Sequence, residues 1–217
     1  MTPSTMYQKQ NIINCYNKVA AKYADQFFGE LAYKPLDRMV LSRFAADNDD
    51  KGKIADLGCG CGHTTAFLQN FGAKNIVGID LSPEMIVMAQ SLCPTIDFEV
   101  GNILELQYPD YHFAAILAFY AIVHFNEAEL AQALTEIHRV TQTDGQFLFS
   151  FHTEEQVMAV ADLLEEKVEV NFHFFDADKV LEMLKDCGWT IVDAFVRYPY
   201  HGKEYPSKRA YILCKKH

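Results

Sequence analysis

The stretch from Lys53 to Asp80 constrains the fold more than any other part of this 217-residue chain. It reads KIADLGCGCGHTTAFLQNFGAKNIVGID, which predicts a buried strand, a glycine loop, a helix and a second strand that ends in an acid. Such a unit holds an adenosine-containing cofactor at the carboxyl ends of its strands. The chain is therefore expected to be an α/β protein with a mostly parallel sheet.

The order of residues inside the glycine loop indicates which class of cofactor it binds. Asp56 comes before the glycines, and Gly58, Gly60 and Gly62 alternate as G-x-G-x-G instead of the dinucleotide spacing G-x-G-x-x-G. A carboxylate in front of the loop suits a cofactor with a cationic amino acid part better than a pyrophosphate. Asp80, 18 positions after Gly62, is expected to accept both hydroxyls of a ribose. An ordinary tight turn is the alternative for the glycines.

With these residues the chain resembles the class I S-adenosylmethionine-dependent methyltransferases, in particular those acting on small molecules. The resemblance implies a Rossmann-like seven-stranded sheet of order 3-2-1-4-5-7-6, with helices on both faces and an antiparallel C-terminal hairpin. It also implies one methyltransferase domain over residues 1–217, with a helical lid at 1–46 and an insertion at 153–175 over the substrate cleft.

Local signals elsewhere agree with alternating strands and helices. Ser82 and Pro83 form a helix start, and Asn126 with Glu129 three residues later is a capping signature. The last two predicted strands, 189–198 and 207–214, have no helix between them and must pair antiparallel. A simple dinucleotide fold would not show this hairpin. The preceding stretch, 153–172, is amphipathic and rich in acids.

Ligands of open α/β sheets bind beyond the carboxyl ends of the strands. The cofactor-binding residues predicted at these ends are Asp56, Gly58, Cys59, Gly60, Gly62, Asp80, Leu81, Met85, Asn102 and Ile103. Asn102 stands where members of the resembled family often have an aspartate, and it keeps an acceptor oxygen for the adenine amino group.

The resemblance adds cofactor contacts from two other segments. Tyr16 and Tyr23 lie in a stretch similar to the family's lid helices, although plain core packing explains both tyrosines as well. Ala118 and Phe119 end the fourth predicted strand, where the family flanks the methionine part of the cofactor.

The segment ILAFYAIVHF resembles the family's short apolar run that ends in histidine. The resemblance makes His124 the candidate catalytic base and places Tyr120 beside the transferred methyl group. The alternative for His124 is a histidine that is packed beneath the cofactor and satisfied by backbone groups. His152, just after the fifth strand, is a second candidate base.

The implied reaction is transfer of a methyl group from S-adenosylmethionine to a small-molecule acceptor by in-line displacement, with S-adenosylhomocysteine as product. The acceptor pocket is expected under the N-terminal helix, the insertion and the segment RYPYHGKEYPSKRAY. Side chains of that segment either line a polar substrate site or belong to a solvent-facing loop; they are Arg197, Tyr200, Glu204 and Tyr205. Two alternatives remain: a non-catalytic module that binds S-adenosylmethionine, and a nicotinamide-dependent oxidoreductase.

The composition limits which partners the protein is expected to bind and in which compartment it is expected. The net charge of -10 disfavours nucleic acid, whose binding depends on Lys and Arg. No stretch approaches the roughly 20 apolar residues of a membrane span. Six cysteines without a C-x-x-C pair, and histidines without metal-site spacing, predict neither a zinc site nor a disulfide framework. A cytoplasmic protein that needs no metal is expected.

Overall fold

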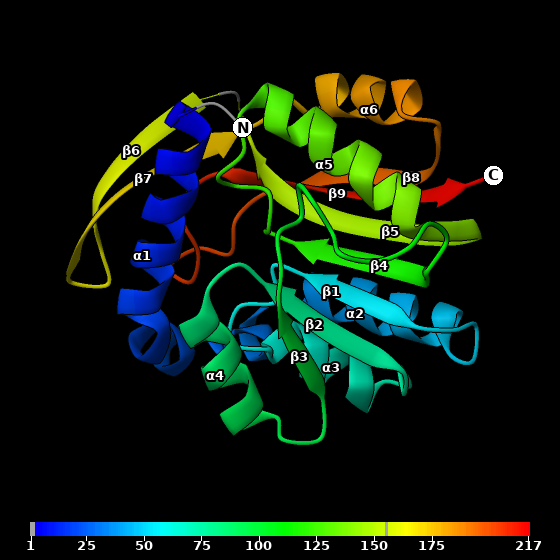
Figure 1. Ribbon diagram of the computed structural model, residues 1–217, viewed down its shortest axis with the longest axis horizontal. Helices are drawn as coiled ribbons and strands as arrows, with labels where there is room; N and C mark the ends of the chain where they lie inside the picture. The colour runs from blue at the N-terminus through cyan, green and yellow to red at the C-terminus, as the bar shows by residue number, and fades with distance from the viewer. Residues whose placement is uncertain (1–2, 155) are drawn as a thin grey trace.

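The computed structural model describes residues 3–154 and 156–217. Residues 1 and 2 of the predicted lid and residue 155 of the predicted insertion therefore lie outside the described residues. Seven strands form one sheet of order β3-β2-β1-β4-β5-β9-β8, and β6 pairs with β7 separately (Figure 1). The predicted order is confirmed, since β8 and β9 are the sixth and seventh strands of that sheet.

The strands of the sheet are β1 (Ile54–Leu57), β2 (Ile76–Asp80), β3 (Asp97–Val100), β4 (Phe113–Phe119), β5 (Thr141–Thr153), β8 (Trp189–Arg197) and β9 (Lys208–Lys216). The helices are α1 (Pro3–Phe27), η1 (Glu30–Tyr33), α2 (Pro35–Asn48), α3 (His63–Asn70), α4 (Pro83–Leu92), α5 (Glu127–Val140) and α6 (Ala177–Asp186). Strands β1 to β5 pair in parallel, whereas β9 is antiparallel to both β5 and β8. The predicted C-terminal hairpin is thus confirmed.

The side chains of β4 point alternately to the two faces of the sheet, which explains the two layers of helices. Ile116 and Ala118 pack into a core with α5 and α6, while Ala115 and Leu117 pack into the opposite core with α2, α3 and α4. All seven residues of β4 are buried, as expected for a parallel strand covered on both faces. The two faces therefore bury separate cores, and the carboxyl ends of the strands remain open for a site.

Two predicted helix starts are confirmed by their caps. The Ser82 hydroxyl accepts a hydrogen bond from the Met85 N–H at the start of α4. Asn126 and Glu129 form a reciprocal capping box at α5, with both bonds 3.0 Å long. Both caps fix the entry of a helix directly after a strand-end loop.

Only part of the N-terminal stretch borders the open end of the sheet. Helix α1 crosses that end and packs against α4 and β7. Helix α2 packs instead on the sheet, where Leu41 and Phe44 share a core with Ile54. Among the described residues no helix has the length and apolarity to cross a bilayer, because the long helix α1 is largely polar.

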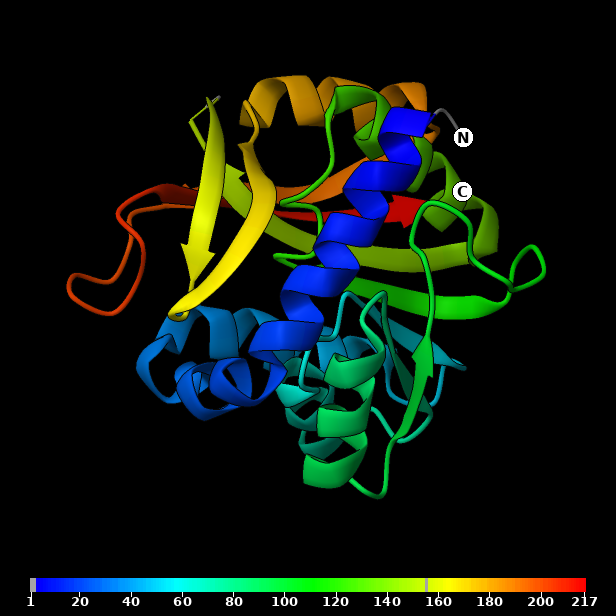
Figure 2. The same ribbon diagram turned by 60° about the vertical axis from the view of Figure 1, so that its left-hand side comes forward.

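The acid-rich insertion is an antiparallel hairpin of β6 (Gln156–Leu163) and β7 (Glu166–Phe174). It extends beside α1 at the open end of the sheet, as Figure 2 shows. An exposed pair, Lys22 and Glu166, joins the two elements at 2.8 Å, and the Lys18 ammonium donates to the Lys167 carbonyl. The hairpin and α1 therefore form one wall beyond the strand ends.

Candidate functional site

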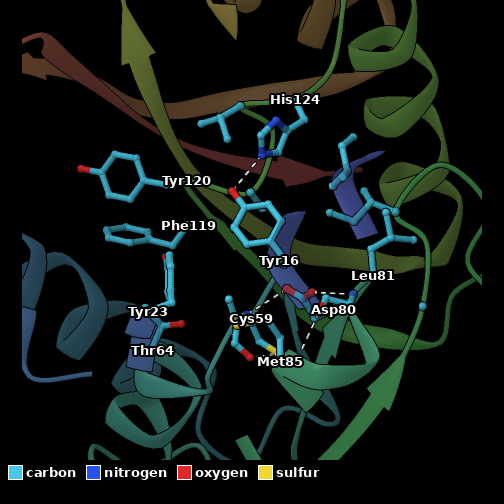
Figure 3. A pocket seen from close by; sticks show the side chains of 18 of the residues that line it. Tyr16, Tyr23, Cys59, Thr64, Asp80, Leu81, Met85, Phe119, Tyr120 and His124 are labelled. Atoms are coloured by element: carbon cyan, nitrogen blue, oxygen red, sulfur yellow. Dashed lines mark hydrogen bonds between the residues drawn. The ribbon is translucent and has the colours of Figure 1, made fainter. Parts of the chain in front are cut away.

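A cavity lies at the carboxyl ends of β1 to β4 beneath α1; we call it the first cavity (Figure 3). It brings together most of the predicted site residues: Tyr16, Tyr23, Gly58, Cys59, Gly60, Asp80, Leu81, Met85, Asn102, Ile103, Phe119, Tyr120 and His124. Three predicted residues lie outside its lining, namely Asp56, Gly62 and Ala118. The strand-end rule thus locates the cavity from the sequence.

Asp80 ends β2 in the predicted position, and its carboxylate is fixed by the backbone. Its Oδ2 accepts the Gly60 N–H at 2.9 Å and its Oδ1 accepts the Ser82 N–H at 2.8 Å. Burial raises the pKa of Asp80, and the backbone N–H groups of Ser82, Gly60 and Leu81 lower it in opposition. A carboxylate has about four acceptor sites, so two remain for hydroxyl groups in the cavity.

Asp56 lies beneath the loop instead of in the cavity. Its Oδ2 accepts the hydroxyls of Thr64 and Thr65 at 2.7 and 2.6 Å, which ties β1 to the first turn of α3. The other oxygen is buried and has no hydrogen-bond partner among the described residues. Burial raises the pKa of Asp56 to about 6 in spite of the two hydroxyls. Direct contact with a ligand in the first cavity is therefore not seen for this predicted residue.

Gly58 and Gly62 serve the packing of the loop. A Cβ on Gly58 would stand 2.4 Å from the Cβ of Ala121, and one on Gly62 would stand 2.8 Å from the ring of Phe98. Both glycines have positive φ, 69° and 84°, which side chains rarely adopt. Ala118 faces the core beneath α5 and α6, because adjacent side chains on a strand point to opposite faces.

Asn102 lines the cavity, but its side-chain oxygen is already engaged. Its Oδ1 accepts the Leu104 N–H at 3.2 Å. One acceptor position of that oxygen remains, so the predicted contact with an adenine amino group requires a shared oxygen. Apolar side chains of Leu81, Met85 and Ile103 form the adjoining lining.

Glu30 and His63 line the first cavity and were missed by the sequence reasoning. Their side chains pair at 3.3 Å, and Lys34 joins Glu30 at 2.9 Å. Burial would lower the pKa of His63, but Cys61 and Glu30 outweigh it and raise that pKa to about 9. A protonated imidazole therefore lies at the start of α3. No local motif indicates the pair, because η1 and α3 are far apart in the chain.

His124 joins α1 to the hairpin. Its Nδ1 lies 2.8 Å from the Asn171 carbonyl oxygen, and its Nε2 lies 2.8 Å from the Tyr16 hydroxyl (Figure 3). A carbonyl only accepts, so Nδ1 carries the proton and Tyr16 donates to Nε2. Burial lowers the pKa of His124 to about 4, so the ring is neutral at pH 7. Both interpretations of His124 hold in part: a backbone group satisfies it, and it borders the cavity.

Tyr120 has an unusual backbone, with φ at 57°, directly after β4. Its N–H donates to the Ser150 carbonyl at 3.0 Å, which holds this conformation. Its hydroxyl lies 2.8 Å from that of Tyr211, which donates to Asp37 and accepts from Arg197. Because Tyr211 donates its only hydroxyl proton to Asp37, Tyr120 must donate to Tyr211. The Tyr120 oxygen can therefore only accept a hydrogen bond from a ligand in the cavity.

A second cavity adjoins the first, bounded by α1, the hairpin and the loop between β8 and β9. Its lining includes His152, Glu204 and Tyr205 from the sequence prediction, but not Arg197 or Tyr200. The interpretation of the β8–β9 segment as a solvent-facing loop is wrong for Glu204, whose side chain is 1% exposed and pairs with Arg197 at 2.6 Å. Long-range ion pairs hold this segment inward.

Comparison with known proteins finds similarity to methyltransferases. A family model described as a methyltransferase domain matches residues 54–145. Demethylmenaquinone methyltransferase of Chlorobaculum parvum is 29% identical over 63% of this chain and 58% of its own length. Malonyl-[acyl-carrier protein] O-methyltransferase of Erwinia billingiae is 36% identical over 65% of this chain and 53% of its own length. The chain thus spans less than two thirds of the length of these curated relatives.

A solved structure shares the fold over the whole chain. The Burkholderia thailandensis 1,6-didemethyltoxoflavin-N1-methyltransferase, with its acceptor and S-adenosylhomocysteine bound, has a TM-score of 0.71 and 18% identity, and covers 100% of this chain and 91% of that one. These similarities support a class I S-adenosylmethionine-dependent methyltransferase.

The first cavity fits the family's cofactor, S-adenosylmethionine. Asp80 keeps two acceptor sites, as a ribose diol requires, and the apolar lining beside it suits an adenine ring. Glu30 and the protonated His63 offer charges of both signs, which match an amino acid's ammonium and carboxylate groups. Asp56, which was expected to meet the ammonium group, supports the loop from beneath.

Proposed function

We propose that this protein transfers a methyl group from S-adenosylmethionine to a small-molecule acceptor held in the second cavity. The observation that carries the proposal is the wall that the two cavities share. Five residues line both cavities: Tyr16, Tyr23, Glu30, Tyr120 and Val123. An acceptor in the second cavity therefore adjoins the cofactor site without any intervening element of the fold.

When bound, S-adenosylmethionine supplies a methyl group on a sulfonium whose leaving thioether is neutral. The protein's main tasks are then to align the acceptor and to exclude water. Alignment of two reactants supplies up to about 7–11 kcal/mol in well-oriented reactions. Helix α1 and the hairpin cover the strand ends and suit both tasks.

For an acceptor that arrives protonated, Tyr16 and His124 form a proton relay. The acceptor's proton passes to the Tyr16 oxygen as the Tyr16 proton moves to Nε2 of His124, which lies 2.8 Å away. The Nδ1 proton keeps its bond to the Asn171 carbonyl, which opposes only part of the burial that lowers the pKa of His124. Methyl transfer removes one positive charge from the sulfonium, so the new imidazolium replaces a charge and adds none. Tyr120 donates its hydroxyl proton to Tyr211, so it can position the acceptor but does not act as an acid.

The acceptors of similar proteins support a small organic acceptor. They concern demethylmenaquinone in Chlorobaculum parvum and 1,6-didemethyltoxoflavin in Burkholderia thailandensis. These acceptors belong to those proteins, and their variety leaves the acceptor atom of this chain open. A non-catalytic module that binds S-adenosylmethionine remains the second hypothesis.

The test measures S-adenosylhomocysteine by mass spectrometry after incubation with S-adenosylmethionine and panels of phenols, amines and carboxylic acids. We expect at least one panel member to raise its production above the acceptor-free rate, and Tyr16→Phe to reduce that rate at least tenfold while cofactor affinity changes less than twofold. Binding of S-adenosylhomocysteine without turnover on any panel would favour the non-catalytic module. Thermal stabilisation by NAD and not by S-adenosylhomocysteine would support the oxidoreductase alternative instead.

A further inference from the structure

The second cavity is large and has many aromatic side chains in its lining. Its volume of about 960 Å³ lies near the upper end of the roughly 300–1,000 Å³ that ligand pockets occupy. The aromatic side chains include Tyr16, Phe27, Tyr120, Phe172, Phe174 and Tyr205. A flat molecule of one or two fused rings therefore finds both room and ring faces to pack against.

The charged side chains in this lining balance one another in number. The three cations and the three carboxylates are Lys34, Lys203 and Arg209, and Glu30, Asp162 and Glu204. Asp162 and Lys203 are exposed to solvent, and Asp162 pairs with Lys167 at 3.2 Å. Only the other four can act as buried charges toward a ligand.

Those four side chains are already paired with each other. The Lys34 ammonium lies 2.9 Å from the Glu30 carboxylate and 3.5 Å from that of Glu204. The Arg209 Nε lies 3.3 Å from a Glu204 carboxylate oxygen. A charged group on a ligand would lose its water here and find no unpaired opposite charge, which is unfavourable.

His152 supplies an uncharged polar group in the same lining. Its Nδ1 lies 2.6 Å from the Ser207 hydroxyl oxygen. Its Nε2 has no hydrogen-bond partner among the described residues and yet is not fully buried, so it is open to the cavity. Burial and then Arg209 lower the pKa of His152 to about 3, so the ring is neutral at pH 7 and a weak base. Hydrogen bonding suits this ring better than the role of a catalytic base.

Neighbouring rings hold His152 in place. It stacks on Phe174 at a centroid distance of 4.8 Å and meets Tyr205 edge-on at 6.3 Å. The Ser207 hydroxyl can donate to Nδ1 or accept from it, so Nε2 can present either a lone pair or an N–H. A hydroxyl group on a ligand can pair with Nε2 in both cases, because it donates and accepts.

We propose that the second cavity takes an uncharged aromatic acceptor, and that Nε2 of His152 makes the hydrogen bond that orients its ring. This inference rests on the proposed function and names the substrate class and a residue that determines specificity. A molecule bound in this way reaches the wall shared with the first cavity, because the His152 ring lies 5.4 Å from the ring of Tyr120.

Titration calorimetry at pH 7 tests the substrate class on the full chain saturated with S-adenosylhomocysteine. Three probes share one ring system: neutral 2-naphthol, the anion 2-naphthoate and the cation 2-naphthylmethylammonium. We expect 2-naphthol to bind at least tenfold more tightly than either charged probe. Equal or tighter binding of a charged probe would overturn the inference, and so would the absence of 2-naphthol binding at millimolar concentration.

Two variants of His152 test the hydrogen bond against a purely structural role. His152→Phe keeps a ring beside Phe174 and Tyr205 but removes Nε2, and it should weaken 2-naphthol binding at least fivefold. His152→Gln loses the ring but keeps a polar group, and it should retain the affinity within about threefold. The opposite order would show that the ring only packs, which would overturn the role of Nε2. His201→Gln, an exposed position outside the cavity lining, is the matched control.

The affinity for S-adenosylhomocysteine separates the two levels of the proposal. His152 does not line the first cavity, so both variants should bind this ligand within twofold of the unaltered chain, which also shows that they are folded. If the unaltered chain fails to bind S-adenosylhomocysteine, the proposed function itself fails. If it binds and the preference for the neutral probe is absent, only the substrate class is wrong.

Discussion

The two adjoining cavities are built in different ways. In the first cavity the key acid, Asp80, is fixed by backbone N–H groups of the glycine loop and of Ser82. In the second cavity side chains from α1, η1, the hairpin and the β8–β9 loop meet through ion pairs. A site made from strand-end backbone depends on one short segment, whereas a site made from distant side chains can change its ligand without changing the fold.

The largest effect should come from adding a side chain to the glycine loop. Gly58→Ala is expected to lower the free energy of unfolding by about 3 kcal/mol, because its Cβ would overlap Ala121 and because φ is positive. Chemical denaturation measures this. Gly202→Ala, with positive φ and open space, isolates the backbone cost at about 1 kcal/mol. Gly29→Ala, with open space around it, is the neutral control; equal values for Gly58 and Gly29 would contradict this account of the loop.

Removal of the fixed acid should abolish most cofactor binding. Asp80→Ala is expected to weaken S-adenosylhomocysteine binding about 100-fold, since hydrogen bonds to charged groups contribute about 1.5–3 kcal/mol. Titration calorimetry measures this, and Asp97→Ala on the exposed start of β3 is the control. Undiminished affinity in the Asp80 variant would remove the basis for assigning the cofactor to the first cavity.

The buried pair of His63 and Glu30 should give a pH-dependent stability. The pKa of His63 is raised from 6.5 to about 9, so its contribution is full below pH 6.5 and is lost as the pH rises through 9. His63→Gln should therefore lower the free energy of unfolding by about 2 kcal/mol at pH 6 and have little effect at pH 10. Denaturation across this range measures it, with the exposed His201→Gln as control. A difference that is independent of pH would show that His63 is not protonated.

The smallest effect should come from the contact between α1 and the hairpin. Lys22→Met removes the pairs with Glu165 and Glu166, but these side chains are exposed to solvent, so global stability should not change measurably. Amide hydrogen exchange should nevertheless rise in β6 and β7 and not in β1. Lys51→Met is the control, and uniform exchange across the sheet would contradict a separately held hairpin.

The features that depend on short stretches of sequence were predicted correctly. The strand, glycine loop and helix around Gly60 follow from short-range geometry, as do the caps at Ser82 and Asn126. The side-chain partners of Asp56 could not be predicted, since the Thr64 and Thr65 hydroxyls bind it beneath the loop.

The three segments that bound the second cavity were predicted from the sequence, but the ion pairs beside it were not. Arg197 meets Asp37 across 160 positions, and no periodicity carries such a contact. The hairpin was also missed as a pair of strands, because most of its side chains are at least partly exposed on both faces and give no clear apolar alternation.

A crystal structure of the protein with S-adenosylhomocysteine tests most directly whether the first cavity binds the cofactor and faces the second cavity, where the acceptor is proposed to bind. We predict that the ribose hydroxyls lie within hydrogen-bond distance of Asp80 and that the sulfur faces the shared wall near Tyr16 and Tyr120. A ligand bound outside the first cavity, or with its sulfur directed away from the second, would contradict the account.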